Sequence, residues 1–173
     1  MRRVFKYTLM IFITSALTFL IFGIITGYRH RKNQEKSIQT LPDVVFQSLD
    51  GDSVNLMAYD WIKPLVVVFF NPECEHCQYE ALEIAQHAEA FSGSQIVLIT
   101  DDDSLARIRI FCETYHLWEV DNIEILLDTD KQIKRVFGRM IFPSVYIYNI
   151  KRNLRKKFLG EIRAEAIINE LAL

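Results

Sequence analysis

Two cysteines separated by two residues, Cys74 and Cys77, place the strongest constraint on how this chain can fold. They follow the apolar run 65–70, whose β-branched and aromatic residues predict a buried strand. Apolar residues then recur at helical spacing from Cys77 to Phe91, and Gly93 would end that helix. The sequence therefore predicts a dithiol at the N-terminal end of a helix that directly follows a central strand.

The position of the dithiol indicates its chemistry. A thiol at the first turn of a helix is favoured as an anion, because unpaired N–H groups and the positive end of the helix dipole face it. Cys74 is therefore the expected nucleophile, and Cys77, one turn further in, is the expected resolving thiol. A cationic His76 would favour the Cys74 thiolate, whereas Glu73 and Glu75 would oppose it. Because these charges act in opposite directions, the sequence predicts a redox pair without predicting its potential.

The uncharged run 7–28 is the second strong feature, and its length suits one helix that crosses a bilayer. Basic residues flank the run on both sides, so the Lys and Arg count gives no preferred orientation. A cleaved signal peptide is the alternative, but its apolar region is normally shorter and ends at a small-residue cleavage site. No such site is evident before Tyr28, so we expect an uncleaved single-pass anchor.

Charge divides the chain at the same place. Residues 1–36 hold seven Lys or Arg against one acidic residue, a net +6, and the remaining residues hold 13 against 21, a net −8. We therefore predict a membrane anchor with basic flanks over 1–32, a polar linker over 33–41 and a soluble domain over 42–173. The acidic balance of the soluble domain argues against nucleic acid as a partner.

The soluble domain alternates between strand and helix patterns. Asp50-Gly51-Asp52 separates two short β-type runs, which predicts a hairpin. Later strands are expected at 65–70, 95–100, 123–127, 143–149 and 154–159, and helices after the dithiol, at about 104–116, within 128–138 and at 163–171. Such alternation predicts an α/β sandwich whose active groups lie beyond the carboxyl ends of the parallel strands.

This arrangement resembles the thioredoxin fold, and most closely the TlpA/ResA-type branch of bacterial extracytoplasmic thiol–disulfide oxidoreductases. The resemblance depends on the hairpin, the strand that leads into Cys74 and Cys77, Glu80 three residues later, and the strand that begins with Pro143. It covers roughly residues 41–173. It implies an α/β, thioredoxin-like three-layer sandwich with an N-terminal β-hairpin, preceded by one transmembrane helix.

The resemblance also implies roles for individual residues. Cys74 and Cys77 match the redox dithiol, so no cofactor is expected beyond the disulfide that they form, and no metal. Pro143 matches the cis-proline of the family, beside which the backbone of Phe142 would meet an extended substrate. Glu80 matches an acidic residue that would accept the proton of Cys77, and a solvated helix carboxylate is the alternative.

The chain departs from the family pattern at three positions. Glu73 replaces the usual tryptophan, Val68 replaces the buried aspartate of thioredoxin, and Phe142 stands where Thr or Val is usual. The absence of the aspartate assigns more of the proton transfer to Glu80. The other two replacements leave the choice of substrate open.

The function implied is a membrane-tethered protein thiol–disulfide oxidoreductase, with the reductase direction favoured over a thiol oxidase or isomerase. Glu75 and His76 would tune the dithiol. The expected partners are protein clients with thiols or disulfides and a membrane or extracytoplasmic electron donor. The expected location is the bacterial inner membrane, with the soluble domain facing the periplasm or the cell exterior.

Other classes of function fit the residues less well. Haem attachment requires a histidine directly after the second cysteine, where Gln78 stands, and a peroxiredoxin-type peroxidase requires a threonine in place of Asn71. A copper- or zinc-delivery module could use both cysteines and His76 but has no evident fourth ligand, and a non-catalytic binding module is the last alternative. Cys112 lies on an apolar helix face and is expected to be a packed core residue.

Overall fold

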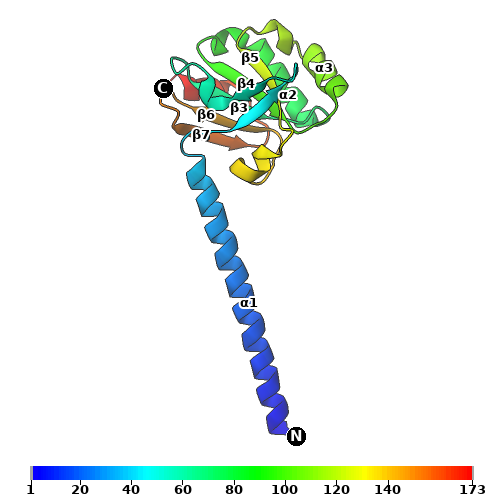
Figure 1. The fold of residues 1–173 in the computed structure, drawn as a ribbon, viewed down its shortest axis with the longest axis vertical. Helices are drawn as coiled ribbons and strands as arrows, with labels where there is room; N and C mark the ends of the chain where they lie inside the picture. The colour runs from blue at the N-terminus through cyan, green and yellow to red at the C-terminus, as the bar shows by residue number, and fades with distance from the viewer. Residues whose placement is uncertain (1, 173) are drawn as a thin grey trace. The chain divides into compact units, whose positions relative to one another are not determined.

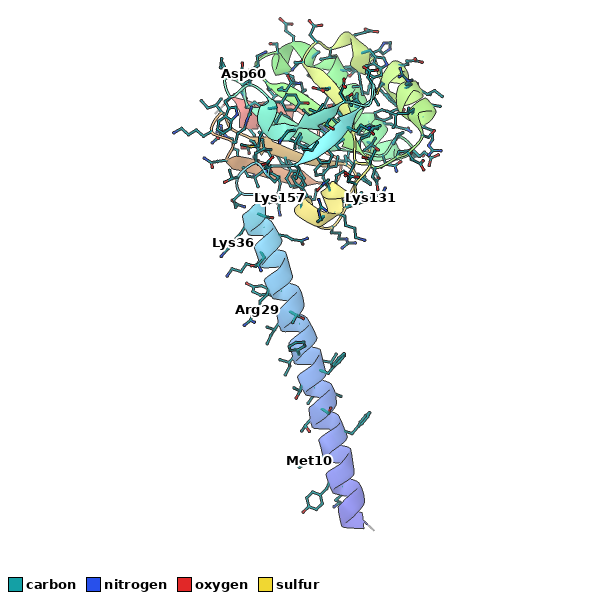
Figure 2. The ribbon with its side chains drawn as sticks, in the orientation of Figure 1. Met10, Arg29, Lys36, Asp60, Lys131 and Lys157 are labelled. Atoms are coloured by element: carbon teal, nitrogen blue, oxygen red, sulfur yellow. The ribbon has the colours of Figure 1, made fainter. Side chains whose placement is uncertain are left out.

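The computed structural model describes residues 2–172, which form two compact units divided after Lys36. The first unit is formed by the helix α1, Arg2–Ser37 (Figure 1). Exposed side chains project along it, among them Met10, Arg29 and Lys36 (Figure 2). In the part of the chain that is described, no helix combines the length and the apolar character of a membrane span. The predicted transmembrane helix is therefore not confirmed.

The second unit is built on a sheet whose strands are β1 (Val45–Ser48), β2 (Ser53–Asn55), β3 (Leu65–Phe69), β4 (Gln95–Thr100), β5 (Ile123–Leu127), β6 (Ser144–Tyr148) and β7 (Leu154–Leu159). Their order in space is β2-β1-β5-β4-β3-β6-β7 (Figure 1). Strands β3, β4 and β5 run parallel, while β1, β6 and β7 each pair antiparallel with a neighbour. The predicted α/β sheet and its N-terminal hairpin, β1 with β2, are confirmed.

Helices and short helical turns cover both faces of this sheet. They are α2 (Glu75–Gln86), α3 (Leu105–Thr114), α4 (Ala164–Leu171), η1 (Leu56–Ala58), η2 (Ala88–Phe91), η3 (Leu117–Glu119) and η4 (Ile133–Phe137). One apolar cluster joins α2, α3 and α4 to one face, and a second joins η1, η4 and residues 38–44 to the other. Because side chains alternate along a strand, Val66 and Val68 of β3 point into the first cluster and Val67 into the second.

The single helix predicted from Cys77 to Phe91 is interrupted. α2 ends at Gln86, and the short turn η2 follows it. His87 leaves the helical conformation, with φ −108° and ψ 22°, and its Nδ1 atom lies 2.9 Å from the carbonyl oxygen of Glu83. Phe91 is nevertheless buried in the first cluster, so the apolar spacing is kept although the helix is not.

The segment predicted as a linker, 33–41, is shared between the two units. It is helical as far as Ser37, where α1 ends. Ile38 and Leu41 are buried in the second apolar cluster, and the Leu41 N–H donates a 2.7 Å hydrogen bond to the carbonyl of Arg152. The packing of the second unit therefore begins at residue 38.

Candidate active site

The register of two neighbouring strands brings the predicted site together. Phe69, at the end of β3, pairs with Ser144, at the start of β6. The chain that leaves β3 toward the dithiol therefore lies beside the chain that enters β6. The Phe142–Pro143 peptide bond is cis, as the resemblance to the family implied. Cys74 Sγ lies 3.9 Å from the carbonyl oxygen of Phe142, so the dithiol and the cis-proline meet in one site.

The two cysteines occupy different environments at the start of α2. Cys74 is the N-cap residue, with φ −87° and ψ 115°, and its carbonyl accepts hydrogen bonds from the N–H groups of Cys77 and Gln78, each at 3.0 Å. Cys74 is half-buried, whereas Cys77 is 2% exposed. A partner molecule can therefore approach the first sulfur but not the second.

The surroundings of Cys77 oppose its ionisation. Burial raises the pKa of the Cys77 thiol, and the neighbouring Cys74 and Glu80 raise it further. The backbone N–H of Asn71, 3.5 Å from the Cys77 sulfur, offsets part of that rise. Cys77 therefore requires a base before it can act as a nucleophile.

Glu80, one turn after Cys77, is 1% exposed. Neither of its carboxyl oxygens makes a hydrogen bond of ordinary geometry with the residues that the structure describes. Burial raises the pKa of Glu80 to about 8, the charge of Glu161 adds to the rise, and the backbone amide of Ile162 opposes it. The alternative of a solvated helix carboxylate is therefore wrong, because this carboxyl is held out of water.

The charged and titratable side chains directly before and between the two cysteines are exposed to solvent. Glu73 and Glu75 are exposed. His76 is also exposed, and its Nδ1 lies 2.5 Å from Oε2 of Glu161, in the loop after β7. Nothing in the sequence points to Glu161, because the residue lies 85 positions from its partner and belongs to no motif.

Cys112 and a possible metal site are the remaining features considered from the sequence. Cys112 is completely buried in the first apolar cluster, so it is a packed core residue as expected, and burial raises its pKa to about 12. Among the side chains that the structure describes, no three His, Cys, Asp or Glu residues are grouped so as to hold a metal ion. The copper or zinc alternative therefore has no ligand cluster among the side chains that are described.

Thioredoxin-like proteins are the class in which a dithiol helix follows a central strand and a cis-proline lies against its first cysteine, and the fold of this chain belongs to that class. Residues 38–157 match the AhpC/TSA family, so the chain is a member of that family. The match begins where the packing of the second unit begins. The resemblance found in the sequence is thereby confirmed.

Several solved structures share the fold. A secreted Mycobacterium tuberculosis disulfide oxidoreductase, homologous to E. coli DsbE, has a TM-score of 0.65 at 20% identity over 79% of this chain and 97% of its own. StoA from Bacillus subtilis has a TM-score of 0.59 at 13% identity over 76% and 98%. A thiol:disulfide interchange protein from Chlorobium tepidum has a TM-score of 0.64 at 17% identity over 78% and 94%. The comparison with curated protein sequences gives no match.

Proposed function

We propose that the protein is a thiol–disulfide oxidoreductase that reduces disulfides of protein clients through Cys74 and Cys77. The observation that carries the proposal is the unequal exposure of the two sulfurs beside the cis-proline, since a client can reach only Cys74. The similar structures named as disulfide oxidoreductases support the same chemistry. No cofactor is required beyond the disulfide that the two cysteines form.

The reaction proceeds by two exchanges. The Cys74 thiolate attacks one sulfur of a client disulfide, that S–S bond breaks, and the other client sulfur leaves as a thiolate and takes up a proton. Cys77 then gives its proton to the Glu80 carboxylate and attacks the sulfur of Cys74. The mixed disulfide breaks and the second client sulfur leaves as a thiolate. The dithiol has then given two electrons to the client and has become the Cys74–Cys77 disulfide.

Other residues of the site would hold the client and tune the sulfurs. The backbone of Phe142 lies against the Cys74 sulfur, which suits it to contact an extended client chain, and the cis bond to Pro143 sets its direction. The Phe142 ring is partly buried between both apolar clusters. Glu75 and His76, in the first turn of α2, would act on the Cys74 thiolate through their charges.

The proposal is tested by the reduction potential of the dithiol. The full 173-residue chain is equilibrated in detergent with glutathione or dithiothreitol buffers, and its thiols are trapped and counted. We expect a reversible two-electron couple near or below about −250 mV, the range of a thiol reductase. A couple above about −180 mV would instead indicate an oxidase or isomerase. Absence of any couple assigned to Cys74 and Cys77 would refute the oxidoreductase function.

We further propose that residues 7–28 anchor the protein in the bacterial inner membrane, with the second unit facing the periplasm or the cell exterior. The proposal is supported by the absence of charge in this run and by its basic flanks. An electron donor in the membrane or outside the cytoplasm would then reload the dithiol. We expect the full chain to stay in the membrane pellet after carbonate extraction, and a chain lacking 7–28 to become extractable. Equal extraction of both would remove the anchor from the proposal.

A further inference from the structure

The loop between β7 and α4, residues 160–163, lies over one face of α2, and we call it the covering segment. It is held at both ends. The N–H of Gly160, a residue with φ +97°, donates a 2.9 Å hydrogen bond to the carbonyl of Pro143. The N–H of Ala164, directly after the segment, donates to Oε2 of Glu83 at 3.4 Å. The segment therefore joins the cis-proline to the dithiol helix.

Three residues of α2 meet the covering segment. His76, Glu80 and Glu83 are spaced four and three residues apart, which places them on one face of the helix. His76 forms an ion pair with Glu161. The backbone amide of Ile162 lowers the pKa of Glu80. Oε2 of Glu83 accepts a hydrogen bond from the N–H of Ala164. Glu161 therefore directly precedes Ile162, the residue whose backbone amide acts on the buried Glu80.

The simplest interpretation of His76 and Glu161 is an ordinary surface ion pair, since their side chains are 69% and 39% exposed. Such pairs contribute little to stability because water and salt screen them. The His76–Glu161 pair differs from an ordinary surface pair because it lies near the buried carboxyl of Glu80. Glu80 is buried and makes no hydrogen bond of ordinary geometry with the described residues, so a nearby charge acts on it with little screening. Two titratable groups interact with it, Cys77 from α2 and Glu161 from the covering segment.

We propose that Glu161 is a positioning residue, whose carboxylate acts through Glu80 on the proton that Cys77 must release. This inference rests on the proposed oxidoreductase function. In the resolving step the proton moves from Cys77 Sγ to the Glu80 carboxylate, and the sulfur electron pair forms the bond to Cys74. A second negative charge beside Glu80 makes it a stronger base, so it takes up that proton more readily.

The test is the titration of Glu80, followed by ¹³C NMR of glutamate-labelled full chain, with Glu80→Gln to assign the signal. Glu161→Gln keeps the size of the side chain but removes its charge. We expect it to lower the midpoint of Glu80 from about 8 by on the order of 0.5 to 1 pH unit. The inflection in the pH profile of mixed-disulfide resolution should move by the same amount. A Glu80 midpoint that does not move would overturn the proposal.

Two further variants separate a charge effect from a loosened loop. His76→Ala breaks the same ion pair but leaves the charge of Glu161, so it should not lower the Glu80 midpoint. A fall as large as that of Glu161→Gln would mean that water enters when the segment loosens, and would overturn the proposal. Glu119→Gln is the control, because Glu119 forms an exposed pair of the same kind with His116 at 2.7 Å and should leave Glu80 unchanged.

The NMR titration needs neither a client nor a redox partner, so its outcome is separate from that of the potential measurement. A stationary Glu80 midpoint together with a reversible dithiol couple would remove Glu161 from the mechanism and leave the proposed function standing. A shifted midpoint without a reversible couple would refute the function, and with it any part of Glu161 in that reaction.

Discussion

Replacing Cys74 with serine is expected to lower the rate of thiol–disulfide exchange by at least about a thousandfold, because a serine hydroxyl is not ionised and forms no disulfide. The reduction of insulin disulfides by dithiothreitol, followed by turbidity, measures this rate. Cys77→Ser should give a different result. Its exposed nucleophile is intact, but no second thiol can resolve the intermediate, so client proteins should accumulate as mixed disulfides on Cys74.

The matched control is Cys112→Ala, which removes the third cysteine from the apolar cluster behind the site. Cys112 is fully buried, so the folded variant should exchange disulfides within about twofold of the parent chain. Trapping is read from gels run without reducing agent. If Cys74→Ser trapped clients as readily as Cys77→Ser, the assignment of nucleophile and resolving thiol would be reversed. If neither variant lowered exchange, the dithiol would not be the reactive group.

Much of the fold could be predicted because its signals are local. The run of β3 is rich in β-branched and aromatic residues, and β4, β5 and β6 lie at apolar runs of the same kind. The helix predicted at about 104–116 begins directly after Ser104, whose hydroxyl caps α3 by accepting a hydrogen bond from the N–H of Arg107. The break after Gln86 was not predictable from spacing, because Phe91 keeps its apolar position although the helix has ended.

The site was predictable only in part. Cys74, Cys77 and Pro143 belong to a motif, and strand pairing brings them together. The burial of Glu80 also had a signal in the sequence, because Glu80 lies three residues after Cys77 and four before Ile84, on the buried stripe of α2. Glu161 had none. An exposed glutamate in a loop is common. The proposed role of Glu161 depends on the contact between the loop after β7 and His76 of α2, which only the tertiary structure shows.

Replacing Glu80 with glutamine is expected to stabilise the protein at alkaline pH. The folded state raises the pKa of this carboxyl from 4.5 to about 8, so between these values the native protein holds a proton that the unfolded chain releases. The free energy of unfolding therefore falls as pH rises through this window, and the loss is complete above about pH 8. From the size of the shift, the contribution is on the order of 3 to 5 kcal/mol.

A glutamine at position 80 has no proton to lose. Below about pH 4.5 the parent and Glu80→Gln should differ little, and near pH 8.5 the variant should be more stable by about 3 to 5 kcal/mol. Urea unfolding at several pH values, followed by circular dichroism, measures the difference. Taking the difference between the two proteins cancels the other titrating groups. Glu165→Gln, at an exposed position of α4, is the control and should show no such trend.

Glu80→Gln should raise the stability of the protein at alkaline pH but slow the resolution of mixed disulfides. A buried carboxylate without hydrogen bonds is costly to the fold at the pH where it is charged. The same carboxylate is the base that Cys77 requires, so the more stable variant should resolve mixed disulfides more slowly. A stability difference that does not change with pH would show that Glu80 has the same pKa in the folded and unfolded states, so that burial does not raise it. Faster resolution in the variant would show that Cys77 gives its proton to another group.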